Sequence, residues 1–341
     1  MPFPDFLVIG AQKAGTSWLY RSLSDHPEIW TPPLKELHYF DQRISEPSFA
    51  ALPARLLGKE YAKEDWYRWF WQFQLKSRLQ KHRKNFDLKG VLWDVRFFAR
   101  SPSDAWYASL FKQGRGMMTG EVTPDYSRLD ESVVAHIYEL MPNAKIIFFI
   151  RNPVERVFSS TAKHLKDLNL MGEQPQTTPY EQLLEMSRKP GLIDQGLISE
   201  TKYLQTLEKW RRFFSDEQIF VGFLEDIHFC PARMLRRLYK FLGVDPSYSQ
   251  QAIRRRINPG SQDMMPTRLA VHLASTFHED LQRLSERFGG YASFWLYSAE
   301  QLVSGAVTED AIPYPLWNSQ LWKEYTSDSS WVGNAQSGPL A

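Results

Sequence analysis

The sequence predicts an α/β fold, a three-layer α/β/α arrangement with a central parallel sheet and a P-loop-like phosphate site. Two observations predict it. Short, continuously apolar runs, typical of buried parallel strands, alternate with segments that carry apolar residues at helical spacing. The first apolar run also ends in a glycine-bounded loop that leads directly into a helical pattern, which is half of a βαβ unit.

The first expected strand is the apolar run FLVI at residues 6–9, and a helical pattern follows it at residues 18–23. The second expected strand is KIIFFI at Lys145–Ile150. A helix is predicted from about residue 154 to 168, because Pro153 suits the first turn of a helix. Each of these two units is a strand followed by a helix.

A third strand is predicted at residues 218–224, where QIFVGFL is again mostly apolar. It is followed by Pro231 and by a helical pattern at residues 233–242. Three strands that alternate with helices favour a parallel sheet over an antiparallel one.

The chain of 341 residues is interpreted as one large domain, because no repeat and no linker composition divides it. We expect residues 1–300 to form this domain, with a helical, aromatic-rich insertion at about 42–103. Residues 301–341 are rich in Ser, Gly, Pro and Trp and are expected to form an irregular tail that packs on the domain.

The insertion carries an aromatic stripe with the i, i+3, i+4, i+7 spacing of one helix face. Its members are Trp66, Trp69, Phe70 and Phe73. We expect a core face, with a ligand platform as the alternative. A basic run follows and is expected to be solvated; it consists of Lys76, Arg78, Lys81, Arg83 and Lys84.

Composition excludes several classes of protein. The chain is 43% hydrophobic and 23% charged, which is typical of globular proteins and not of disordered ones. Its net charge of +2 lacks the basic excess of a nucleic-acid binder. Cys230 is the single cysteine, so a disulfide framework and a thiolate metal site are excluded. No signal sequence or apolar run long enough to span a membrane is found, so we expect a cytoplasmic protein.

The loop GAQKAGTS at residues 10–17 nearly has the phosphate-loop spacing G-x-x-x-x-G-K-[ST]. Its lysine, however, is Lys13, inside the loop, and Thr16 follows the second glycine. Successive backbone N–H groups and a helix N-terminus can still hold one anion. The hydroxyls of Thr16 and Ser17 would add donors. An ordinary glycine turn with a solvated lysine is the structural alternative.

A metal-dependent kinase would need an acidic residue at a neighbouring strand end to hold Mg²⁺. The strand Lys145–Ile150 is followed instead by Arg151. An arginine neutralises anion charge directly, so the sequence predicts an anion site and no metal. A simple helix-capping role for Arg151 is the alternative at this position.

Two motifs in this order resemble those of sulfotransferases that use 3′-phosphoadenosine 5′-phosphosulfate (PAPS). GAQKAGTSWLY looks like their 5′-phosphosulfate loop, and IRNPVERVFS at residues 150–159 resembles their 3′-phosphate motif. The resemblance implies that Arg151 and Ser159 bind the 3′-phosphate. It also implies donor contacts from Lys13, Ala14, Gly15, Thr16, Ser17 and Trp18.

Further segments resemble the heparan-sulfate branch of that family. LKELHYFD at residues 34–41 is similar to the segment that supplies its catalytic glutamate, which matches Glu36. GEVTPDY at residues 120–126 and the segment 223–243 are similar to later parts. Many members have lysine where this chain has Val122. The resemblance covers about residues 5–40 and 104–290.

Other features look more like bacterial soluble members of the family, notably the run RRRIN at residues 254–258. In this interpretation Arg255 and Arg256 contact the donor. Three adjacent arginines cannot all point inward, so their individual roles stay open.

Glu36 and His38 are two residues apart, so on a strand they would lie on the same side. We expect Glu36 to be the general base and keep His38 as a second candidate, because imidazole titrates near neutrality. A surface ion pair is the structural alternative.

The resemblance implies transfer of a sulfuryl group from PAPS to a hydroxyl, or less readily an amine, without a metal. The other product would be adenosine 3′,5′-bisphosphate. The acceptor stays open among small molecules, glycans and lipid headgroups. Two alternatives remain: a metal-dependent P-loop kinase, and a protein that binds adenosine bisphosphate without turnover.

Overall fold

The computed structural model describes residues 3–42, 65–98, 102–170, 201–248 and 264–327. Its central sheet has five strands in the order β2-β3-β1-β4-β5, and every pair is parallel. The α/β fold with a central parallel sheet is therefore confirmed. The strands of this sheet are β1 (Phe6–Gly10), β2 (Ile29–Trp30), β3 (Met118–Val122), β4 (Lys145–Ile150) and β5 (Ile219–Phe223).

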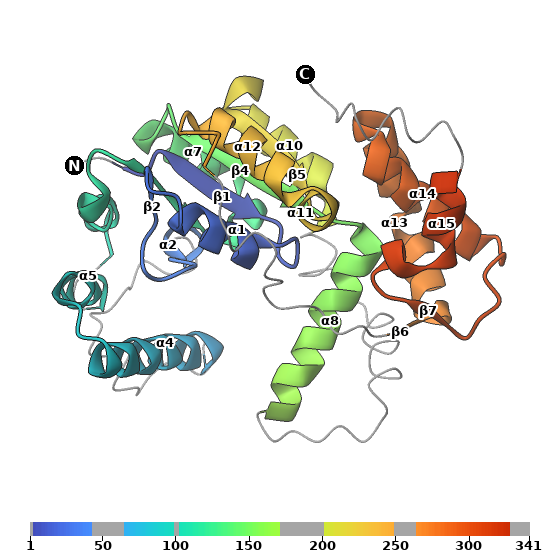
Figure 1. The fold of residues 1–341 in the computed structure, drawn as a ribbon, viewed down its shortest axis with the longest axis horizontal. Coiled ribbons are helices and arrows are strands. Elements are labelled where there is room, and N and C mark those ends of the chain that lie inside the picture. Colours follow the sequence, from blue (N-terminus) through green and yellow to red (C-terminus); the bar gives the residue numbers. More distant parts are fainter. Residues whose placement is uncertain (1–2, 43–64, 99–101, 171–200, 249–263, 328–341) are drawn as a thin grey trace.

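Helices connect these strands and extend the chain beyond them (Figure 1). Up to β4 they are α1 (Thr16–Ser24), α2 (Tyr39–Gln42), α4 (Asp65–Lys84), α5 (Leu88–Phe98), α6 (Asp104–Ser109), η1 (Lys112–Gly114), η2 (Pro124–Arg128) and α7 (Glu131–Leu140). After β4 they are α8 (Pro153–Leu170), α10 (Tyr203–Arg211), η5 (Asp216–Gln218), α11 (Leu224–Phe229), α12 (Pro231–Leu242), α13 (Thr267–Phe288), α14 (Gly290–Val303), η6 (Leu316–Asn318) and α15 (Gln320–Ser327).

Helices cover both faces of the sheet. Register pairs Ile147 of β4 with Phe220 of β5, so Phe148, the next residue of β4, faces the opposite side from Phe220. The ring of Phe148 contacts Tyr203 of α10 at 5.8 Å, whereas Phe220 contacts Phe241 of α12 at 5.4 Å. The sheet is therefore the middle of three layers, which explains why its strands are apolar on both faces.

The insertion is helical in its described part, where α4 and α5 lie. Lys76, Lys81, Arg83 and Lys84 are exposed as predicted, but two other side chains differ from expectation. Phe73 is 55% exposed rather than part of the core. The side chains of Trp66, Trp69 and Phe70 lie outside the described part. In the basic run, Arg78 is buried rather than solvated, because its guanidinium pairs with Asp94 of α5 at 2.9 Å.

The tail predicted to be irregular contains regular structure. A two-stranded antiparallel sheet joins β6 (Met264–Pro266) to β7 (Ala311–Pro313), and α15 follows. Figure 1 shows α13, α14 and α15 together, beside the sheet and close to α8. Within the residues that the structure describes, no helix is both long and apolar enough to cross a membrane.

Candidate active site

The phosphate loop connects β1 to α1, and Gly15 is the residue that its geometry requires. Gly15 has φ 87° at the N-cap of α1, a conformation that side chains disfavour. A Cβ there would also lie 2.6 Å from Ile227 of α11. The backbone can therefore turn tightly at the start of α1, where N–H groups and the helix dipole favour an anion.

The other loop residues predicted to hold the donor are brought to the same helix start. Thr16 opens α1 and is buried, Ser17 is half-buried, and Ala14 and Trp18 are buried. Lys13 is half-buried and has φ 67°, so its backbone is also left-handed.

Arg151 lies directly after β4 and reaches the phosphate loop. Its Nη1 donates to the carbonyl of Lys13 at 3.2 Å, and its Nε and Nη2 donate to Glu155 at 3.1 and 3.0 Å. Nη2 also donates to the hydroxyl of Tyr314 at 2.7 Å. Burial alone would lower the pKa of Arg151, but Tyr314 and Glu155 outweigh it and raise that pKa.

Ser159 is half-buried in α8, two turns after Arg151. Within the described residues, no hydrogen bond joins the side chains of Arg151 and Ser159. Arg255 and Arg256 lie outside the described residues.

Glu36 and His38 face each other, but not from a strand. Both residues are in a loop, with φ 66° and 52°, so the strand expected here is wrong. The loop is held by β3 and the residue after it: Glu36 N donates to the carbonyl of Val122 at 3.1 Å, and Leu37 N donates to Thr123 Oγ1. His38 Nε2 lies 3.8 Å from Glu36 Oε2.

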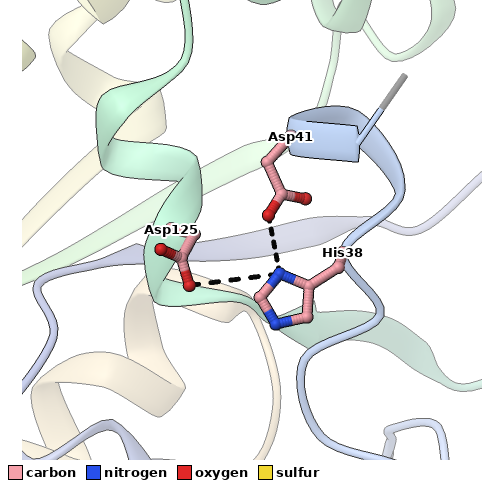
Figure 2. Close-up of side chains that lie close together, drawn as sticks. All are labelled: His38, Asp41 and Asp125. Atoms are coloured by element: carbon pink, nitrogen blue, oxygen red, sulfur yellow. Dashed lines mark hydrogen bonds and ion pairs between the residues drawn. The ribbon is translucent and has the colours of Figure 1, made fainter. Parts of the chain in front are cut away.

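His38 is buried in an acidic cluster (Figure 2). Its Nδ1 is 2.6 Å from Asp41 Oδ2 and 4.0 Å from Asp125 Oδ2. Burial alone would lower the pKa of His38. The hydrogen bond to Asp41, the nearby Glu36 carboxylate and the charges of Asp41 and Asp125 outweigh it and raise the pKa to about 10. The imidazole is therefore protonated at neutral pH.

Glu36 has the complementary charge. Burial would raise its pKa, but the nearby His38 imidazole and the hydrogen bond and charge of Lys35 lower it to about 2. Lys35 Nζ donates to Glu36 Oε1. The carboxylate is thus ionised over the whole physiological range, and its side chain is 28% exposed, so an incoming group can reach it.

The group His38, Asp41 and Asp125 also has the spacing of a metal site, with candidate ligand atoms within 4.8 Å of one another. A metal ligand must be a neutral imidazole. A metal ion here would compete with the proton that His38 shares with Asp41, so the three side chains can act either as a charge network or as ligands.

This network is joined to the phosphate loop. Gln12 Nε2 donates to Asp125 Oδ1 at 2.9 Å, and Arg128 donates to the same oxygen at 2.6 Å. Sequence analysis did not assign roles to Asp41, Asp125 or Gln12. Asp41 could have been found from its position three residues after His38. Asp125 could not, because only the fold brings η2 to this loop.

Comparison with known proteins shows which family has these residues and this fold. A family model described as "Sulfotransferase family" matches residues 4–248. The chain belongs to the sulfotransferase family. The match includes the phosphate loop, Glu36, His38, Arg151 and Ser159, and it ends before the helices α13 to α15.

The names of two relatives of this sulfotransferase include heparan sulfate. This chain is 31% identical over 174 residues to the mouse (Mus musculus) heparan sulfate glucosamine 3-O-sulfotransferase 3B1. The alignment covers 50% of this chain and 43% of the relative. The chain is 25% identical over 252 residues to the mouse bifunctional heparan sulfate N-deacetylase/N-sulfotransferase 4, covering 72% and 23%. The chain thus spans less than half the length of each.

A solved structure has the same fold. The sulfotransferase from Alicyclobacillus acidocaldarius aligns with a TM-score of 0.53 at 23% identity, covering 84% of this chain and 96% of that chain. This likeness confirms the sulfotransferase fold.

Proposed function

We propose that this protein transfers a sulfuryl group from PAPS to a hydroxyl of a small-molecule, glycan or lipid-headgroup acceptor. The observation that carries the proposal is the ionised Glu36, held by His38 and Lys35 and joined through Asp125 and Gln12 to the phosphate loop. Family membership supports PAPS as the donor.

The donor would occupy two anion sites. The backbone at the start of α1 and the hydroxyls of Thr16 and Ser17 would hold the 5′-phosphate, and Lys13 would stabilise the negative charge that grows on it as it leaves. Arg151 and Ser159 would bind the 3′-phosphate. Arg255 and Arg256 would add cationic contacts.

The reaction forms a bond between the acceptor oxygen and sulfur and breaks the bond between sulfur and the 5′-phosphate oxygen. The electron pair of the broken bond stays on the phosphate. The hydroxyl proton goes to Glu36, which can accept it as the new bond makes that hydroxyl acidic. The products are a sulfate ester and adenosine 3′,5′-bisphosphate.

Glu36 is favoured over His38 as the base. With a pKa of about 10, the imidazole has no lone pair available at neutral pH. His38 would instead orient the Glu36 carboxylate and balance its charge. A hydroxyl acceptor is supported by the relative named a glucosamine 3-O-sulfotransferase, whereas the N-sulfotransferase relative leaves the amine as the second possibility.

The test is transfer of labelled sulfate from PAPS into extracts of the host, followed by identification of the labelled product. We expect one labelled class of sulfate ester, formed without added Mg²⁺. Labelled phosphate transfer from MgATP would favour the kinase instead. Binding of adenosine 3′,5′-bisphosphate with no transfer to any acceptor would favour a protein without turnover.

A further inference from the structure

Tyr314 is the feature that the family match does not account for. It follows β7, outside the matched residues 4–248, yet its hydroxyl accepts a hydrogen bond from Arg151 Nη2 at 2.7 Å. The guanidinium of Arg151 also lies over the Tyr314 ring, with its carbon 5.1 Å from the ring centre. Tyr314 therefore makes two contacts, a hydrogen bond and a ring contact, with Arg151, the residue proposed to bind the 3′-phosphate.

The segment around Tyr314 is held against α8 at two further points. Leu316 N donates to Glu155 Oε1, while Glu155 Oε2 accepts from Arg151. The Tyr314 ring packs against Phe158 at 4.8 Å, and Phe158 immediately precedes Ser159. Glu155 thus fixes Arg151 and the Tyr314 segment together, on the part of α8 that leads to Ser159.

The Tyr314 hydroxyl has an unused donor. The side chain is only 5% exposed, and the hydroxyl accepts from Arg151, yet its own hydrogen has no acceptor within the described residues. A buried donor without an acceptor is unfavourable. The proposed function places the donor's 3′-phosphate at Arg151, beside this hydroxyl, so an oxygen of that phosphate is the acceptor that suits this position.

We propose that the Tyr314 hydroxyl donates to an oxygen of the donor's 3′-phosphate and so helps the protein select nucleotides that carry this group. The inference rests on the proposed function, which places the 3′-phosphate at Arg151 and Ser159. It extends the donor site beyond the residues that the family model matches, to the residue after β7.

The test compares the affinities of two probes, adenosine 3′,5′-bisphosphate and adenosine 5′-phosphate, by titration calorimetry. Tyr314→Phe keeps the ring and removes only the hydroxyl. Because a hydrogen bond to a charged group is worth more than a neutral one, we expect affinity for the bisphosphate to fall about 10-fold or more. Affinity for the monophosphate, which lacks the 3′-phosphate, should be unchanged.

Tyr297→Phe is the matched control, since Tyr297 lies in α14 and its ring contacts Tyr325. It should change neither affinity. If Tyr314→Phe is poorly folded, Tyr314→His retains a hydrogen-bond donor and should keep a larger preference for the bisphosphate than Tyr314→Met. Equal preferences in these two variants would contradict the inference.

The inference is overturned if Tyr314→Phe leaves the ratio of the two affinities unchanged, or if it tightens bisphosphate binding, since the hydroxyl would then compete with the phosphate. Arg151→Met separates this failure from failure of the proposed function. If Arg151→Met lowers bisphosphate affinity and Tyr314→Phe does not, only the role of Tyr314 is wrong. If neither does, the 3′-phosphate site itself is wrong.

Discussion

Lys13, Glu36 and His38 share a backbone feature: within the described residues they are the non-glycine residues with positive φ, at 67°, 66° and 52°. Such conformations cost about 1–3 kcal/mol each. Neighbouring contacts offset this, because the Lys13 carbonyl accepts from Arg151 and Glu36 N donates to Val122. The strained backbone conformations therefore occur at the three residues proposed to carry the chemistry. A positive φ points these side chains in directions that a helix or strand would not allow.

Glu225 gives a prediction at the same scale. It is buried, Trp295 Nε1 donates to its Oε1 at 2.7 Å, and its Oε2 has no partner in the described part of the chain. Burial and the charge of Glu155 raise its pKa to about 8, whereas in the unfolded chain the pKa is near 4.5. The folded state then binds more protons between these values, so its stability falls as pH rises through this window.

The glutamine in Glu225→Gln has no carboxyl group, so it does not titrate in this pH window. Relative to the wild type, we expect its Tm to be similar at pH 5 and higher at pH 9 by at least about 2–4 °C, the change that 1 kcal/mol produces in a large domain. Thermal unfolding at both pH values measures this. Exposed Glu300→Gln should show no such difference, and a Glu225→Gln shift that is the same at both pH values would refute the raised pKa.

At the scale of elements, the sequence predicted the strands that are themselves apolar runs and missed β2 and β3 of the central sheet, as well as β6 and β7. The strands β1, β4 and β5 are apolar runs and were predicted. By contrast, β3 contains two polar residues: Thr119 donates to Asp5, and Glu121 accepts from Tyr107 and Tyr126. Dependence on distant partners also explains why the Glu36 loop was predicted as a strand. Its conformation is set by hydrogen bonds to β3 and the residue after it, and not by its local sequence pattern.

The helices of the insertion carry a second prediction. Arg78 is buried against Asp94, and its Nη1 donates to the carbonyl of Pro33 at 3.2 Å, three residues before Glu36. Arg78→Met would leave Asp94 with His82 as its remaining partner. We expect a loss of up to about 3 kcal/mol in the free energy of unfolding, measured by urea denaturation.

Lys76→Met is the control, because Lys76 is an exposed residue of the same helix and should change stability by about 0.5 kcal/mol or less. Equal effects of the two substitutions would mean that the Arg78–Asp94 pair does not hold α4 and α5 to the Pro33 loop.

At the scale of the whole molecule, the proposed site lies where the carboxyl ends of parallel strands meet, as is usual for ligand sites in open α/β sheets. The loop after β1 supplies Lys13, the residues after β4 supply Arg151, and η2 after β3 supplies Asp125. The sequence predicts that Lys13 and Arg151 each follow a strand of one parallel sheet. The proposed role of Tyr314 could not be predicted from the sequence, since only the packing of the residues after β7 against α8 brings Tyr314 to Arg151.

The two proposed anion sites predict the ligand preference of the folded protein. Adenosine 3′,5′-bisphosphate should raise the Tm by several degrees without Mg²⁺, because a ligand at 100 times its Kd stabilises by about 2.7 kcal/mol. ATP, which lacks a 3′-phosphate, should have a smaller effect. A shift that occurs with ATP and requires Mg²⁺ would support the kinase.

The central claim is that Glu36 accepts the acceptor's proton, and the kcat of Glu36→Gln, measured with the acceptor identified by labelled transfer, tests it most directly. The amide keeps the size of the side chain but cannot act as the base, so kcat should fall about 10²- to 10⁴-fold with the Kd for adenosine 3′,5′-bisphosphate nearly unchanged. His38→Asn, which removes an orienting charge, should reduce kcat less. An active Glu36→Gln beside an inactive His38→Asn would contradict the account and make the histidine the base.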